Sequence, residues 1–229
     1  MKKKQPAITL LSNDGRYMLL FRRELMAALL ARGYRGILLC PPFAELNDLL
    51  GLGVAFQPVD LKRGSLNILA DLRFYRQVKR LLKSIQPEVH INYSIKCVLY
   101  GSLAAHRSGA ARIYSMITGL GYAFIGRDPL NLLIRFYAVR MYRLALPWNR
   151  RVFFMNQADL QLFLDYRLLR ESQARVLPGE GVNLNEFQPR TPDDGSPPIV
   201  FLFVGRLLKD KGIHEYVAAA RMAREVLHD

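Results

Sequence analysis

The sequence predicts an α/β protein in which a Rossmann-like parallel-sheet domain is followed by the first strand and helix of a second, truncated Rossmann-like domain. Short apolar runs of strand length alternate along the chain with longer segments of helical periodicity. The apolar runs lack the regular polar alternation of half-exposed strands, which indicates a parallel sheet covered on both faces. Of the 229 residues, 51% are hydrophobic and 23% are charged, a composition typical of globular chains.

The first part of the predicted sheet contains three strands around one helix. The three apolar runs that predict these strands are residues 7–11, 37–40 and 54–59. A helix is expected over residues 16–32, where apolar side chains recur at helical spacing and Gly33 supplies a natural end. The residues expected on its buried face are Met18, Phe21, Leu25 and Leu29.

The middle of the chain predicts further strand and helix units. Ser65 is expected to cap a helix that runs to Ile85 and is broken by Pro87. This helix has a basic flank, which is either a plain solvated face or a membrane-binding surface. The flank consists of Arg73, Arg76, Lys79, Arg80 and Lys83. Further strands are expected at residues 88–92, 112–117, 151–155 and 175–177, and further helices at 98–107, 130–146 and 158–164.

The helix expected at residues 130–146 has two interpretations. It is apolar but carries Arg135, Arg140 and Arg143, and Trp148 follows it. Such a helix could lie on an anionic membrane. It could also be a core helix whose arginines extend to the surface, and we favour this second interpretation.

A change of composition divides the chain. Residues 189–198 contain four prolines with two aspartates and a glycine, which predicts a linker between a domain at 1–188 and a second one beginning at 199. A strand is expected at 199–204 and a helix from Gly212 to the end. One strand and one helix cannot bury a core, so residues 199–229 are expected to be the truncated start of a domain.

The charge of the chain indicates an anionic partner. The formal net charge is +14, which suits nucleic acid, an acidic membrane surface or phosphorylated substrates. The sequence contains no recognisable nucleic-acid-binding module, so nucleic acid is not an expected partner. Neither a secretory signal nor an apolar run of about 18 residues is apparent. Cys40 and Cys97 lack metal-ligand or redox spacing, and we expect a cytoplasmic protein with buried free thiols.

Residues 204–212 are the most informative for chemistry. Gly205 and Gly212 allow the backbone to approach a ligand closely at the start of a helix, where free N–H groups and the helix dipole favour anions. Arg206 can grip phosphate oxygens and Lys211 adds a second positive charge. The segment therefore suits a diphosphate leaving group. Taken on spacing alone, a solvated basic turn fits it about as well.

Several segments together resemble the retaining glycosyltransferases of family 4, which have the GT-B fold. Residues 201–213 resemble the start of that family's carboxyl-terminal domain, and residues 178–183 resemble its interdomain stretch. Other segments resemble members that build bacterial polysaccharides and lipid-linked glycans. These segments are residues 92–96, 100–105 and 117–124, together with Phe21-Arg22. Residues 154–159 resemble a further element of the first domain in the family as a whole. The resemblance implies that residues 1–188 form the amino-terminal half of a GT-B fold.

The resemblance also implies roles for individual residues. Arg206, Lys211, Gly205 and Gly15 would bind the donor diphosphate or lie near it. The acceptor side of the cleft would contain Thr118, Gly119, Gly121, Lys96 and Arg22. Glu180, Gly181 and Asn183 would form the interdomain segment.

The chain departs from the family pattern at several places. Thr118 lies roughly where many members have a histidine near the reacting sugar. Glu180 and Asn183 replace the serine and aspartate that are common in the interdomain motif. The two-glutamate motif that contacts the donor would lie beyond Asp229. The sequence therefore identifies no catalytic residue, and we expect the 229-residue chain to be inactive by itself.

The resemblance implies transfer of a sugar from a nucleotide-sugar, expected to be UDP-linked, to a lipid-linked glycan in cell-surface polysaccharide biosynthesis. The enzyme would be peripheral at the inner face of the plasma membrane. No cofactor is expected, and no metal either, because His214-Glu215 lacks a third ligand. Two alternatives stay open: a nucleotide-sugar 2-epimerase of the same fold, and a non-enzymatic membrane-surface remnant.

Overall fold

The computed structural model describes residues 5–62, 67–120, 124, 128–189 and 200–227. Its contacts divide the chain into two units, Met1–Val182 and Asn183–Asp229, which are considered separately. The linker expected at 189–198 falls, except for Pro189, outside the described residues.

The described part of the first unit contains a seven-stranded parallel sheet with the order β3-β2-β1-β4-β5-β6-β7. The strands are β1 (Ala7–Leu11), β2 (Arg35–Cys40), β3 (Ala55–Pro58), β4 (Val89–Tyr93), β5 (Arg112–Ile117), β6 (Arg151–Phe154) and β7 (Ala174–Val176). Central strand β1 is buried throughout, as expected for a strand covered on both faces. The parallel α/β fold predicted from the sequence is confirmed.

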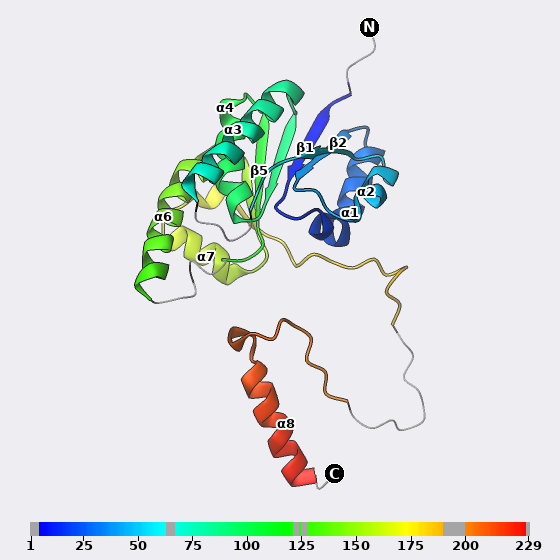
Figure 1. Ribbon diagram of the computed structural model, residues 1–229, viewed down its shortest axis with the longest axis vertical. Helices are drawn as coiled ribbons and strands as arrows, with labels where there is room; N and C mark the ends of the chain where they lie inside the picture. Colours follow the sequence, from blue (N-terminus) through cyan, green and yellow to red (C-terminus); the bar gives the residue numbers. More distant parts are fainter. Residues whose placement is uncertain (1–4, 63–66, 121–123, 125–127, 190–199, 228–229) are drawn as a thin grey trace. The chain divides into compact units, whose positions relative to one another are not determined.

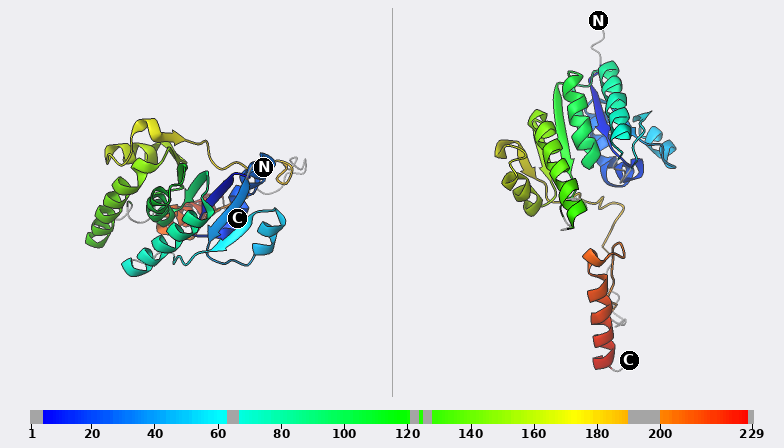
Figure 2. Two further views of the ribbon diagram at one scale, coloured as in Figure 1. Left: turned by 90° about the horizontal axis from the view of Figure 1, so that it is seen from above. Right: turned by 60° about the vertical axis from the view of Figure 1, so that its left-hand side comes forward.

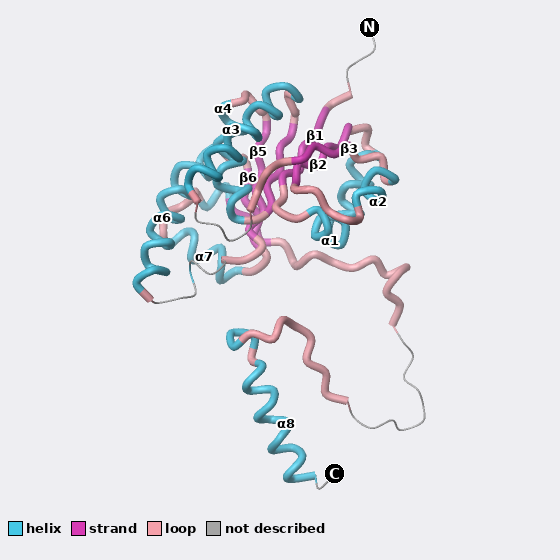
Figure 3. The backbone as a smooth tube through the Cα atoms, in the orientation of Figure 1, coloured by secondary structure: helices cyan, strands magenta, loops and turns pink. Residues whose placement is uncertain are grey.

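Helices cover the two faces of this sheet unequally (Figures 1, 2 and 3). One face packs against α1 (Gly15–Ala31) and α2 (Leu46–Gly51), which lie over β1, β2 and β3. The other face packs against a larger group of helices. This group comprises α3 (Ile68–Ile85), the π-helix η1 (Cys97–Gly101), α4 (Ser102–Arg107), α6 (Pro129–Ala145) and α7 (Gln157–Asp165). Short 3-10 turns follow at η2 (Leu146–Trp148) and η3 (Glu171–Gln173).

The larger core lies under this second group of helices. Phe163 of α7 is fully buried there, and its ring contacts the rings of Tyr142 at 4.9 Å and Phe154 at 5.1 Å between centroids. Edge-on ring contacts of this kind add to the free energy gained from burial alone. The ends of α6 and α7 are thus fixed to β6 by aromatic packing.

A buried polar network lies between β1, β4 and β5. Nδ1 of His90 lies 2.8 Å from Oγ1 of Thr9, and its Nε2 lies 2.9 Å from Oδ1 of Asn92. Because an amide oxygen can only accept, Nε2 carries the proton and Thr9 donates to Nδ1. Asn92 in turn donates to Ser102 and Ser115. Complete burial lowers the pKa of His90 to about 4, so the ring is neutral at physiological pH.

The π-helix η1 approaches this network closely. A side chain at Gly101 would overlap the amide oxygen of Asn92 and the end of Leu11, so only glycine fits there. The sequence predicted one α-helix over residues 98–107, whereas the structure has η1 followed by α4. A π-turn is a local widening that hydrophobic periodicity does not reveal.

Two sequence expectations about helices are wrong. The buried stripe of α1 is Gly15, Met18, Arg22 and Met26, while Phe21 and Leu25 are exposed. The stripe is displaced because a charged residue, Arg22, occupies a buried position. The cap of α3 is Asn67, whose side chain accepts from the N–H of Ala70 at 3.1 Å, and not Ser65, which lies outside the described residues. The short α2 was not predicted.

The second unit has little regular structure in its described residues. It contains a 3-10 turn, η4 (Lys209–Lys211), and one helix, α8 (Ile213–Leu227). Tyr216 of α8 donates to the carbonyl of Phe201 at 2.8 Å and its ring contacts Phe203. The strand expected at 199–204 is wrong for residues 200–204, which are not in a ladder. A strand needs hydrogen bonds from a neighbouring strand, which this unit does not provide among its described residues.

Candidate functional site

The order of the strands identifies the functional edge of the first unit. The chain moves outward from β1 through β2 to β3, then returns to β4 on the other side of β1. The loops after β1 and β4 therefore leave the sheet toward opposite faces at their carboxyl ends. In open α/β sheets, ligands bind at this switch point.

The loop after β1 places the start of α1 at this edge. Asp14 caps the helix by accepting from the N–H of Tyr17 at 3.2 Å. Gly15, expected near the donor, is the first residue of α1 and is buried. The ring of Phe43 occupies the space that a side chain at Gly15 would need. This close approach explains the glycine by packing.

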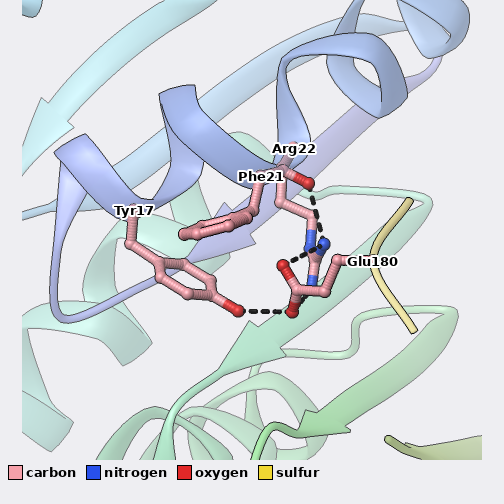
Figure 4. Close-up of polar contacts among 4 residues, drawn as sticks. All are labelled: Tyr17, Phe21, Arg22 and Glu180. Atoms are coloured by element: carbon pink, nitrogen blue, oxygen red, sulfur yellow. Dashed lines mark hydrogen bonds and ion pairs between the residues drawn. The ribbon is translucent and has the colours of Figure 1, made fainter. Parts of the chain in front are cut away.

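Arg22 and Glu180 meet at the same edge although they are 158 positions apart in the sequence (Figure 4). Two guanidinium nitrogens of Arg22 donate to the two carboxylate oxygens of Glu180 at 2.7 and 3.0 Å. The hydroxyl of Tyr17 donates to the same carboxylate at 2.6 Å. We call Tyr17, Arg22 and Glu180 the clamp. A bidentate charged pair is the strongest such contact available to an arginine.

Two aromatic rings lie near the buried guanidinium of the clamp. The guanidinium of Arg22 lies 5.8 Å from the ring centre of Tyr17 and 5.3 Å from that of Tyr93, on the last residue of β4. Burial and the hydrogen bond to Glu180 raise the pKa of Tyr17 above its usual range, and burial raises the pKa of Tyr93 to about 12. Both hydroxyls therefore stay protonated at physiological pH.

The backbone around Glu180 explains how its side chain reaches α1. Gly179 and Gly181 have φ angles of +99° and +72°, which other residues adopt rarely. These two left-handed residues enclose Glu180. The clamp thereby attaches the segment that leaves the sheet after β7 to the middle of α1.

A second polar cluster lies after β4. Lys96 donates to Asp71 of α3 at 2.6 Å, and the hydroxyl of Tyr100 donates to the same carboxylate at 3.1 Å. The hydroxyl of Tyr137 on α6 lies 2.8 Å from that of Tyr100. Ser94 precedes this cluster with a positive φ of 72°, so the chain turns sharply where β4 ends. The cluster connects Lys96 to α3 and α6.

The remaining residues predicted for the acceptor side follow β5. Thr118 is exposed directly after the strand, and Gly119 follows with a φ of 157°. Gly121 lies outside the described residues. The hydrogen bonds described join Arg22 to Glu180 and Lys96 to Asp71, but they do not join these pairs to Thr118.

The residues predicted for the donor diphosphate lie in the second unit. Gly205, Arg206 and Lys211 are exposed, and Lys211 is the last residue of η4. Gly212 follows with a φ of 79° and leads into α8. Asn183, expected in the interdomain segment, begins the second unit and accepts from the N–H of Asn185 at 3.1 Å. The diphosphate role of these residues stays a prediction.

Sequence reasoning missed most partners in the two clusters. Tyr17, Tyr93, Asp71, Tyr100 and Tyr137 were not predicted as site residues, although they complete the clamp and the Lys96 cluster. One signal was available: Arg22 lies four residues after Met18 and four before Met26, and a charge inside such an apolar stripe indicates a buried partner.

Two other kinds of site, a cavity and a metal centre, have less support as ligand-binding sites in the described residues. A cavity of about 520 Å³ lies at the amino edge of the sheet, beside Gln5, Arg35 and Pro87. That edge is opposite to the one where ligands bind in sheets of this type. Within the described residues, no group of three or more His, Cys, Asp or Glu side chains could hold a metal ion.

Known proteins resemble this chain over most of its length. An N,N'-diacetylbacillosaminyl-diphospho-undecaprenol alpha-1,3-N-acetylgalactosaminyltransferase from Campylobacter jejuni is 24% identical over 95% of this chain and 61% of its own length. A glycosyltransferase structure from Rickettsia africae has a TM-score of 0.58 at 16% identity, over 86% of this chain and 47% of that one. Anabaena HepE, solved with UDP and glucose, has a TM-score of 0.54 at 13% identity, over 78% and 45%.

The chain thus spans less than two thirds of the length of these relatives. The two structural likenesses support the Rossmann-like fold of the first unit. The family described as "Glycosyl transferase 4-like domain" matches residues 21–180, from Phe21 next to Arg22 through Glu180. Because this match covers well over half of the chain, the protein belongs to the glycosyl transferase 4-like domain family.

Proposed function

We propose that this chain is the acceptor-side part of a retaining glycosyltransferase that moves a sugar from a UDP-linked donor to a lipid-linked glycan in cell-surface polysaccharide biosynthesis. The observation that carries the proposal is the family match, which runs from Phe21 in α1 to Glu180 and includes strands β2 to β7. The Campylobacter relative, whose name specifies a diphospho-undecaprenol-linked acceptor, supports the kind of acceptor.

The acceptor would be held where the strands of the first unit end. Lys96, Thr118 and Gly119 follow the central strands β4 and β5 at this edge. In this proposal Arg22 acts as a positioning residue, because its guanidinium is already engaged with Glu180. The clamp would fix where the chain leaves the sheet and enters the donor-binding part of the enzyme.

The donor diphosphate would be bound by the second unit. Arg206 offers a planar fork that matches two phosphate oxygens, and Lys211 offers a compact charge close to the start of α8. As the bond between the sugar and the diphosphate breaks, negative charge grows on the leaving oxygen, and fixed cations stabilise it. We propose that residues 183–229 alone cannot complete this site, since their described part contains no sheet.

We further propose that the enzyme works at the cytoplasmic face of the plasma membrane as a peripheral protein. Its net charge of +14 suits an anionic surface. None of the helices in the described residues is long and apolar enough to cross a bilayer.

A chimera tests the proposed activity. Residues 1–182 of this chain would be joined to the carboxyl-terminal part of the Campylobacter relative and assayed with labelled UDP-sugars and polyprenyl-diphosphate-linked saccharides. We expect sugar transfer by the chimera, while the 229-residue chain binds the acceptor lipid without transferring sugar. Failure of both proteins to bind any such acceptor would contradict the proposal. Release of an epimerised UDP-sugar without acceptor would favour the epimerase instead.

A further inference from the structure

The outward face of α6 is unusually apolar. Helices at the surface of a globular unit normally bury one apolar stripe and expose a polar face. The buried stripe of α6 is made by Asn131, Ala138, Tyr142 and neighbouring residues. On the opposite side, Leu133, Phe136 and Leu144 recur at helical spacing and are 65%, 61% and 59% exposed. Water therefore covers a second apolar stripe.

The first turns of α3 continue this apolar surface. Ile68 and Leu72 are exposed there, and both line a groove of about 240 Å³ between α3 and α6. The other side of the groove is formed by Tyr137 and Met141 of α6, with Tyr100 and Leu103 from η1 and α4. We call Ile68, Leu72, Leu133, Phe136 and Leu144 the α3–α6 surface.

The charges on the two helices have one sign. α6 carries three arginines and no acidic residue, and one of them, Arg140, lies 5.4 Å above the ring of Phe136. α3 carries five basic residues, and its one carboxylate, Asp71, is buried and paired with Lys96. An apolar stripe with interspersed arginines is the pattern of helices that lie in the headgroup region of a bilayer.

We propose that the α3–α6 surface docks the protein on an anionic phospholipid bilayer, with α6 lying in the plane of the headgroups. Leucine and phenylalanine side chains enter the acyl boundary, while the arginines and lysines bind lipid phosphates. A second copy of the chain suits this surface less well, because a symmetric contact would bring cations against cations. In this proposal α6 packs its inner stripe into the core, as favoured from the sequence, and lays its outer face on the bilayer.

The surface is also connected to the acceptor edge. Tyr137, at the side of the groove, joins Tyr100, Asp71 and Lys96 through successive hydrogen bonds and an ion pair. A lipid-linked acceptor embedded in the same bilayer would thus meet Lys96 next to the membrane surface. This last step rests on the proposed function, whereas vesicle binding itself requires no sugar transfer.

Vesicle binding by the full 229-residue chain tests the proposal. Binding would be measured by co-sedimentation with phosphatidylglycerol-containing vesicles and with pure phosphatidylcholine vesicles. We expect the parent protein to bind the anionic vesicles. The double variant Leu133→Ser with Phe136→Ser should bind them at least roughly tenfold more weakly, because each substitution removes a large apolar side chain that the bilayer would bury. The matched control is Leu20→Ser with Leu50→Ser, two exposed leucines on α1 and α2, which should bind like the parent.

The possible outcomes separate the alternatives. All four substituted residues are exposed, so thermal unfolding should be unchanged in both variants. The proposal is overturned if the parent ignores anionic vesicles, or if both double variants lose binding equally. It is also overturned if Leu133→Ser with Phe136→Ser abolishes a dimer seen by analytical ultracentrifugation while vesicle binding persists. If the parent protein fails to bind vesicles but still binds the acceptor in detergent, the docking proposal is overturned while the proposed function is retained.

Discussion

Apolar segments of similar composition form buried strands in the first unit of this chain and are exposed in the second. In the first unit, strands such as β1 are buried on both sides, and their neighbours supply every ladder contact. In the second unit, Phe201, Leu202 and Val204 form an equally apolar run, yet they are exposed and in no strand. The helix α8 nevertheless forms in the same unit. The hydrogen bonds of a helix are local, whereas a strand depends on another part of the chain.

The largest difference between the units should appear on removal of one aromatic side chain. Phe163→Ala leaves a cavity among three aromatic rings and should lower the free energy of unfolding of the first unit by about 3–5 kcal/mol. Urea unfolding followed by the fluorescence of Trp148, the single tryptophan, would measure this change.

The matched control is Phe201→Ala in the second unit, where the side chain is 74% exposed. It should change the same transition by less than about 0.5 kcal/mol. Equal effects of the two substitutions would mean that the second unit shares the core of the first, contrary to this account.

A similar contrast applies to ion pairs within the first unit. Glu180→Ala leaves the buried guanidinium of Arg22 without its partner and should cost about 3 kcal/mol of stability. The exposed pair between Arg16 and Glu45, 3.5 Å apart, is the control, and Glu45→Ala should cost at most about 0.5 kcal/mol. Denaturation midpoints at equal slope would show both effects. A Glu180→Ala protein as stable as Glu45→Ala would mean that water reaches Arg22.

The buried histidine predicts a dependence of stability on pH. The pKa of His90 is lowered to about 4 in the folded protein, while in the unfolded chain it is near 6.5. The unfolded state therefore binds a proton in a range where the folded state does not. This contribution to stability is complete above about pH 6.5 and is lost as pH falls toward 4, by up to about 3 kcal/mol.

Unfolding of His90→Gln and His214→Gln across this pH range would check the assignment. The first substitution should remove the dependence between about pH 4 and 6.5, even if its stability is lower throughout. The second changes an exposed histidine of the second unit and should leave the dependence intact. A dependence that survives His90→Gln would point to another titrating group.

The smallest expected contrast concerns two asparagines that accept from backbone N–H groups. Asn156 caps α7 through a 2.7 Å hydrogen bond from the N–H of Asp159, and Asn156→Ala should cost about 1 kcal/mol. Asn183 makes a similar bond in the second unit, and Asn183→Ala should leave the unfolding of the first unit unchanged. Thermal unfolding of both variants would measure the difference. A destabilising Asn183→Ala would show that its turn belongs to the cooperative unit.

How much of this molecule the sequence predicts depends on how local each feature is. Residues 7–11 and 112–117 were predicted as strands with the same bounds that the structure has. The partner of Arg22 could not be predicted, because Glu180 comes from the far end of the unit. The strand at 199–204 failed for the same reason, since its apolar pattern says nothing about whether a partner strand is present. The roles of Arg206 and Lys211 rest on resemblance and stay untested.

Photo-crosslinking tests the central claim most directly, namely that the acceptor is held at the carboxyl edge of the sheet in the first unit. A polyprenyl-diphosphate-linked saccharide carrying a diazirine would be irradiated with the 229-residue chain, and modified peptides would be identified by mass spectrometry. We predict labelling of the peptides that contain Lys96 and Thr118, with reduced labelling in the presence of unlabelled acceptor. Labelling confined to α1 and α2, or to residues 183–229, would contradict the account.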